Sequence, residues 1–157
     1  MIKFDPFEIF DRRWALVTAG TKDHWNTMTI SWGMMGTMWS RPCVTVYVRD
    51  SRYTLEFLEN CDTFTLSFFD EKYKKDLGIL GSVSGRDHDK VAMTSLTPVV
   101  LDEGIGFEQA KMTIVCKKLY EQRMDLDAMP AEIVDHYYGD KDVHHMFIGQ
   151  VLEIEAQ

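Results

Sequence analysis

The sequence is poor in cysteine and proline, and it has no long apolar run. Its 157 residues include three cysteines, Cys43, Cys61 and Cys116, without a C-x-x-C pair. This argues against a disulfide framework or a zinc–cysteine site, and we expect a reducing, cytoplasmic environment. No segment reaches the roughly 20 apolar residues of a membrane helix. Residues 1–6 also lack a signal-peptide pattern, so we predict no membrane association.

Basic residues are also scarce. The chain has 17 Lys and Arg against 25 Asp and Glu, a formal net charge of -8. This charge repels nucleic acid on average, because phosphate binding needs clustered basic side chains. The short run Lys72, Lys74 and Lys75 is typical of a solvated helix face. We therefore predict no nucleic-acid partner.

What the chain has is enough apolar material for one core and many short strand-like runs. Apolar residues make up 45% and aromatic residues 12%, and we expect a single domain over residues 1–157. Period-two or β-branched patterns predict strands over 13–20, 25–33, 42–49, 63–69, 97–101, 105–120 and 145–155. Short helices are expected over 51–60, 70–80 and 130–137. Without regular strand–helix alternation, this favours a mainly β, antiparallel barrel with peripheral helices.

The strand expected over residues 25–33 places Thr27, Thr29 and Ser31 on one face. Met28, Ile30 and Trp32 would lie on the other. The row of hydroxyls could bind a planar polar ring lying along the strand. Taken alone, the pattern is more typical of the solvated face of an antiparallel strand.

Residues 49–54 (RDSRYT) lead directly into an expected helix, with Asp50 or Ser51 as the N-cap. Arg52 can form bidentate hydrogen bonds with a phosphate, and Thr54 adds a hydroxyl. The start of the helix would direct free N–H groups at the same anion. Alternatively, Arg52 pairs with Glu56 four residues later.

In order along the chain, NTMTISWGMMGTMWSRP, VYVRDSRYT, FTLSFF and SGRDHDK resemble the flavin reductase-like, FMN-binding split-barrel family, particularly its flavoredoxin-like branch. FEQAKMTIVCKKLY and HHMFIGQV match more loosely. The resemblance implies an antiparallel split β-barrel of Greek-key type with a few short peripheral helices. It also implies a homodimer that holds one FMN per subunit near the interface. Residues 122–142 match nothing that we can assign.

The resemblance further implies which residues bind the cofactor. Those expected beside the flavin ring and ribityl chain are Asn26, Thr27, Met28, Thr29 and Ser31, with Trp32 as a candidate for stacking. Those expected at the phosphate are Arg52, Tyr53 and Thr54, with Ser51 and Arg49 as further candidates. Ser84 and Lys90 lie in a matching loop expected beside the flavin.

These expectations favour an FMN-dependent oxidoreductase. NAD(P)H would pass hydride to the flavin N5, and electrons would then go to a small-molecule or protein acceptor. The sequence has no G-x-G-x-x-G after a strand, so the nicotinamide would bind only transiently. The alternatives are an FMN-carrying electron-transfer protein without its own nicotinamide reaction, and a non-enzymatic structural or sensor role. The acceptor, the choice between NADH and NADPH, and the permanence of FMN binding stay open.

The adjacent residues His144 and His145 invite a metal hypothesis. Neighbouring strand residues point to opposite faces, so the two cannot easily bind one ion. We therefore predict ordinary histidines and no metal site, with His145 as a weak candidate near the active site. Asp87 and Asp89 are interpreted as part of a polar turn, and no catalytic side chain is assigned.

Overall fold

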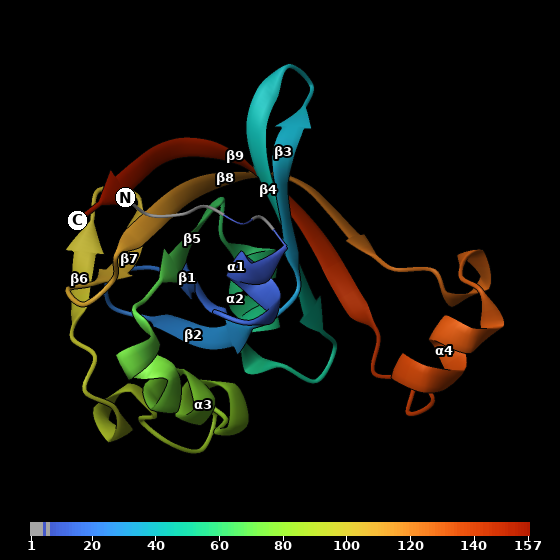
Figure 1. Ribbon diagram of the computed structural model, residues 1–157, viewed down its shortest axis with the longest axis horizontal. Helices are drawn as coiled ribbons and strands as arrows, with labels where there is room; N and C mark the ends of the chain where they lie inside the picture. Colours follow the sequence, from blue (N-terminus) through green and yellow to red (C-terminus); the bar gives the residue numbers. More distant parts are fainter. Residues whose placement is uncertain (1–4, 6) are drawn as a thin grey trace.

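The structure, a computed structural model, describes residue 5 and residues 7–157 (Figure 1). The expectation about a leader sequence concerns residues that lie mostly outside this range. The strands are β1 (Ala15–Gly20), β2 (Trp25–Ile30), β3 (Gly33–Met38), β4 (Arg41–Arg49), β5 (Thr63–Phe68), β6 (Pro98–Leu101), β7 (Gly104–Phe107), β8 (Met112–Arg123) and β9 (His144–Ala156). The α-helices are α1 (Glu8–Asp11), α2 (Tyr53–Asn60), α3 (Lys74–Ser82) and α4 (Ala131–Tyr137). None of these described helices is long and apolar enough to cross a membrane.

Seven strands form one antiparallel sheet in the order β2-β1-β5-β8-β9-β4-β3. The sheet curls strongly, with the long β8–β9 pair arching over the top in Figure 1. Strands β6 and β7 form a separate small hairpin. This architecture confirms the predicted mainly β, antiparallel split barrel with a few short helices.

The barrel core follows from the period-two alternation of the strands. On β4, Val44, Val46 and Val48 are fully buried, whereas Tyr47 between them and Arg49 after them are only half-buried. The second group lies on the outer face, because successive strand side chains point to opposite sides. A row of half-buried side chains on the outer face of β4 is therefore available to a site.

A second apolar cluster lies beneath α3. Leu77 and Leu80 on this helix pack with Leu16, Leu96 and Phe107. Helix α3 covers part of β2, and the Thr29 hydroxyl donates to the Leu77 carbonyl at 2.5 Å. This packing holds the carbonyl end of α3 beside β2.

The strand expected over residues 25–33 is two strands. Strand β2 ends at Ile30, the chain turns at Ser31 and Trp32, and β3 begins at Gly33 and pairs with β4. The sequence of β3, GMMGTM, has two glycines and one β-branched residue, so its intrinsic strand preference is low. Its strand conformation comes from pairing with β4, which sequence periodicity does not reveal.

Two further boundaries differ from the sequence prediction. The strand expected over 105–120 is interrupted between Phe107 and Met112, which separates β7 from β8. Helix α2 has Arg52 as its N-cap, with no capping side chain, so neither Asp50 nor Ser51 caps it. Both of those side chains make other contacts, described below.

The cysteines agree with the sequence expectation. All three are free, and Cys43 and Cys116 are buried. Burial raises the pKa of Cys116 to about 12, so this thiol stays protonated and behaves as a small apolar group.

Candidate functional site

A groove lies on the outer face of the barrel, between the edge strand β2 and the ends of β4 and β9. It contains a cavity of about 210 Å³. The residues that line it are Met28, Thr29, Ile30, Ser31, Trp32, Tyr47, Arg49, Arg52 and His144. The structure thus brings together Met28, Thr29, Ser31, Trp32, Arg49 and Arg52 of the predicted set.

A second, more apolar cavity of about 430 Å³ adjoins this groove and shares Ser31, Trp32 and Tyr47 with it. Its other walls come from α1, β3 and the segment between β8 and β9. They include Phe10, Gly33, Met34, Met124 and Tyr138. Together, the two cavities offer a polar end beside Arg52 and an apolar, aromatic end beside Trp32.

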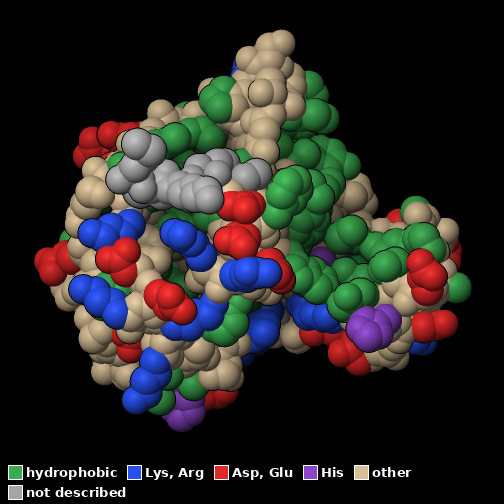
Figure 2. Space-filling view, viewed as in Figure 1, with side chains coloured by type: hydrophobic (Ala, Val, Ile, Leu, Met, Phe, Trp, Pro, Cys, Tyr) green, Lys and Arg blue, Asp and Glu red, His purple; other side chains and the backbone are tan. Residues whose placement is uncertain are grey.

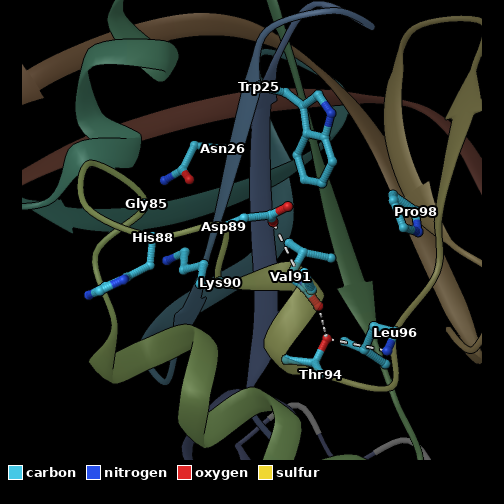
Figure 3. A pocket seen from close by; sticks show the side chains of 11 residues that line it. Trp25, Asn26, Gly85, His88, Asp89, Lys90, Val91, Thr94, Leu96 and Pro98 are labelled. Carbon is cyan, nitrogen blue, oxygen red and sulfur yellow. Dashed lines mark hydrogen bonds between the residues drawn. The ribbon is translucent and has the colours of Figure 1, made fainter.

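Two other predicted residues, Asn26 and Lys90, line a third cavity of about 520 Å³ (Figure 3). Asn26 donates through Nδ2 to Thr54 Oγ1 at 2.8 Å, which ties β2 to α2. A Cβ atom on Gly85 would lie 2.2 Å from Asn26 Oδ1. Only glycine therefore permits this loop to approach the pair so closely.

Arg52 and Lys90 meet at the carbonyl end of α3. Arg52 Nη1 donates to Gly81 O, and Lys90 Nζ donates to Leu80 O, both at 2.9 Å. Lys90 is only 5% exposed, and no carboxylate among the described residues lies within ion-pair distance of either side chain. Burial, and then the charge of Arg52, lower the pKa of Lys90 to about 8. The helix dipole offsets only part of this positive charge, so the pair suits an anion.

The start of α2 adds to the same positive end. No side chain caps its first turn, and the Leu55 N–H donates to Arg52 O, so the N–H groups of Tyr53 and Thr54 are the ones available to an anion. The alternative pairing of Arg52 with Glu56 does not occur. Glu56 forms an ion pair with Arg86 instead.

Ser51 and Arg49, both expected near the phosphate, bind the segment between β8 and β9. Ser51 donates to the Asp142 carboxylate through its N–H at 2.9 Å and its hydroxyl at 2.6 Å. Arg49 donates to the carbonyls of Asp142, at 2.6 Å, and Tyr137, at 3.2 Å. These contacts fix residues 124–142, the arm that carries α4 away from the barrel in Figure 1, beside the groove.

The remaining predicted residues line neither the groove nor the adjoining cavity. Thr27 is fully buried and its hydroxyl lies 2.8 Å from that of Thr18, so the expected open row of three hydroxyls is wrong. Thr54 is buried against Asn26, as described above, and the Tyr53 ring packs edge-on against Phe57. Ser84 accepts a hydrogen bond from the Arg86 N–H at 3.2 Å.

Sequence reasoning missed three groove residues, Ile30, Tyr47 and His144, and of the two adjacent histidines it singled out His145. The antiparallel register pairs His144 with Arg49 and thereby directs it to the groove. Its Nδ1 lies 2.8 Å from the Tyr138 hydroxyl. Burial, followed by the charge of Arg49, lowers its pKa to about 4, so this histidine is neutral at pH 7.

The fold and groove define a split-barrel protein with a cationic end and an aromatic end. Residues 7–157 match the sequence profile of the Flavin reductase like domain, and the chain belongs to this family. Structures similar to it include flavoredoxin from Methanosarcina acetivorans, with a TM-score of 0.72, 18% identity, and coverage of 92% of this chain and 68% of that one.

Two further structures have the same fold. An FMN-binding protein from Thermus thermophilus, solved with bound 1-cyclohex-2-enone, has a TM-score of 0.73, 20% identity, and coverage of 96% of this chain and 73% of that one. An NADH:FAD oxidoreductase from Streptomyces globisporus has a TM-score of 0.70, 17% identity, and coverage of 92% of this chain and 74% of that one. No curated protein sequence matches the chain.

The low pKa of His144 predicts how stability depends on pH. The unfolded chain binds a proton at the ordinary histidine pKa of about 6.5, whereas the folded chain resists protonation down to about 4. The free energy of unfolding should therefore fall, by up to about 3 kcal/mol from this group, between pH 6.5 and pH 4. Urea titrations across this range should show a weaker pH dependence for His144→Gln. An unchanged dependence would contradict the assignment.

Proposed function

We propose that this protein is an FMN-dependent oxidoreductase that binds the cofactor in the groove between β2, β4 and β9. The observation that carries the proposal is the pair of cations, Arg52 and Lys90, that has no carboxylate partner among the described residues. The 5′-phosphate of FMN would balance their charge and accept from the uncapped start of α2. The family match supports a flavin, and the cation pair supports one that carries a phosphate, such as FMN.

The rest of the groove suits a planar ring system. Trp32 and Tyr47 border both the polar and the apolar cavity, and Ser31 supplies a polar group between them. Met28 closes the barrel side, and Met34 extends the apolar surface. Aromatic and thioether groups pack well against flat conjugated rings. We assign the ring to this part of the groove.

Bound FMN would supply the redox chemistry, accepting hydride from a nicotinamide and passing electrons to an acceptor. The protein residues bind and orient. His144 is neutral and hydrogen-bonded to Tyr138, so it can hold a hydrogen bond at the groove without adding charge. The adjoining apolar cavity, lined by Phe10 and Met124, has room for a transient reductant or acceptor.

We also propose that the protein is a homodimer that associates through the β3–β4 hairpin. Met34 and Trp39 on this hairpin are 63% and 52% exposed, and Met38 is 44% exposed. Figure 2 shows hydrophobic side chains gathered along the hairpin and toward the arm. Such a continuous apolar surface is typical of a protein interface.

The free cysteines and the absence of a membrane-spanning helix among the described residues agree with a cytoplasmic protein that acts on soluble partners.

An alternative within the same site is an FMN-carrying electron-transfer protein that does not react with nicotinamides. The fold similarity to flavoredoxin favours it as strongly as the similarity to an NADH:FAD oxidoreductase favours an enzyme. Both functions need the same phosphate and ring contacts. Reaction with nicotinamides distinguishes the two functions, whereas FMN binding does not.

The cation pair predicts the effect of Arg52→Ala on cofactor binding. The wild-type protein should retain FMN near one equivalent per chain after removal of the excess, seen by its visible absorption. Arg52→Ala should weaken FMN affinity by one to two orders of magnitude, because it removes a charge-assisted bond of about 1.5–3 kcal/mol. Fluorescence titration measures the FMN affinity of the wild-type protein and of the variant. Arg13→Ala, an exposed arginine outside the groove, is the control and should bind FMN normally. Equal affinities for all three proteins would place the phosphate elsewhere.

Reactivity with nicotinamides decides between the two functions. We predict that stopped-flow mixing of FMN-loaded protein with NADH or NADPH bleaches the flavin absorption. Bleaching by neither reductant would contradict the enzyme. If photoreduced protein then passed electrons to an acceptor, the electron-transfer role would be supported instead.

A further inference from the structure

A second group of ionisable side chains lies on the opposite face of β9 from the groove. His145 on β9, Glu121 on β8 and Glu59 in the last turn of α2 bring their ligand atoms within 4.8 Å of one another. The register pairs Arg123 with His145, so Glu121 and His145 are diagonal neighbours on one sheet face. These residues come from three elements, and none of them belongs to the proposed flavin site.

The arrangement leaves one nitrogen of His145 without a partner. Its Nδ1 is buried and has no hydrogen-bond partner among the described residues, and the whole side chain is 14% exposed. This atom lies 3.9 Å from Glu59 Oε1 and 3.9 Å from Glu121 Oε1, too far for hydrogen bonds. Two ligands of one zinc ion, each about 2.0–2.2 Å from the metal, are roughly 3.4 Å apart. Small side-chain adjustments would therefore enclose a metal ion.

The hydrogen bond at the other ring nitrogen of His145 determines which nitrogen is free to bind a metal ion. His145 Nε2 lies 2.8 Å from Asp50 Oδ1, so the ring proton belongs there and the Nδ1 lone pair faces the two glutamates. Asp50 is itself held by Arg123 through Nε and Nη2, at 2.7–3.2 Å. A histidine that donates its second N–H to a fixed carboxylate is the usual support for a metal ligand.

One cation lies close enough to compete with a metal. Lys118 Nζ is 3.4 Å from Glu121 Oε2 and donates to the carbonyls of Leu58 and Glu59. It approaches the oxygen of Glu121 that faces away from His145. The Oε1 atoms of both glutamates therefore remain directed at Nδ1.

We propose that Glu59, Glu121 and His145 bind one divalent transition-metal ion such as Zn²⁺, with water completing its coordination. One imidazole nitrogen and two carboxylates suit zinc, whereas Mg²⁺ and Ca²⁺ prefer oxygen ligands only. The ion would join the end of α2 to the β8–β9 pair. Because binding occurs only in the folded state, it would stabilise the protein.

Zinc titration tests this site on its own, because it needs no flavin. Chelator-treated, flavin-free protein is titrated with ZnCl2 in a calorimeter, and we expect one zinc ion per chain and a rise in melting temperature. Loss of a residue that only hydrogen-bonds to a metal ligand typically weakens metal affinity ten- to hundredfold. Glu121→Gln, which changes an exposed residue and leaves His145 intact, should therefore weaken zinc binding about tenfold or more.

Glu132→Gln, an exposed change on α4, is the matched control and should bind zinc as the wild type does. Circular dichroism checks that both variants fold. If Glu121→Gln bound zinc as tightly as the wild type does, zinc would be binding at other histidines. That result would overturn the proposal. No binding to the wild type would also overturn it.

Discussion

The carbonyl end of α3 receives two cationic side chains, Arg52 from the start of α2 and Lys90 from the loop after α3. Because both side chains donate to carbonyls in the last turn of α3, these two contacts set how the peripheral elements lie around the barrel. They join α2, α3 and the loop at one point, and the Thr29 hydroxyl fastens the same helix to β2. They also concentrate positive charge in a partly buried place, where a charge without a partner is unfavourable. An anionic ligand would relieve that cost, so under the proposed function the contacts that organise the site would also select what the site binds.

The arm between β8 and β9 is coupled to the same site. Arg49 and Ser51 hold Asp142, and His144 holds Tyr138, so two groove residues together with Ser51 position the arm. The arm in turn contributes Met124 and Tyr138 to the apolar cavity. Residues at the cationic end of the groove therefore also shape the adjoining apolar cavity. Under the proposed function, a substitution in the arm would change reactivity without contacting the flavin.

Much of the barrel could be predicted from the sequence, because Val44, Val46 and Val48 show the strand period directly. Strand β3 could not, since its conformation depends on pairing with β4 and its own residues have little strand preference. The family resemblance also predicted a place for Arg52 at a phosphate and for Lys90 beside a flavin, and these remain predictions. Their convergence on one helix end could not be predicted, because it depends on where α3 stops.

The side-chain partners within the site were the least predictable part. Thr27 and Thr29 have the same place in the alternating pattern. Yet the buried Thr27 hydroxyl is hydrogen-bonded to Thr18, whereas the Thr29 hydroxyl donates to a carbonyl of α3. His144 and His145 differ only in which face they occupy, and the β4–β9 register sets this. Contacts between distant segments decide such cases, and a local pattern cannot contain them.

The central claim is that the charge at Arg52 and Lys90 binds a phosphate, and comparing FMN with riboflavin, which lacks the phosphate, tests it most directly. The affinity of the flavin-free protein for each is measured by fluorescence quenching at pH 7, below the pKa of about 8 for Lys90. We predict that FMN binds about a hundredfold or more tightly than riboflavin, because two charge-assisted contacts are lost without the phosphate. Equal affinity for the two flavins would contradict the account.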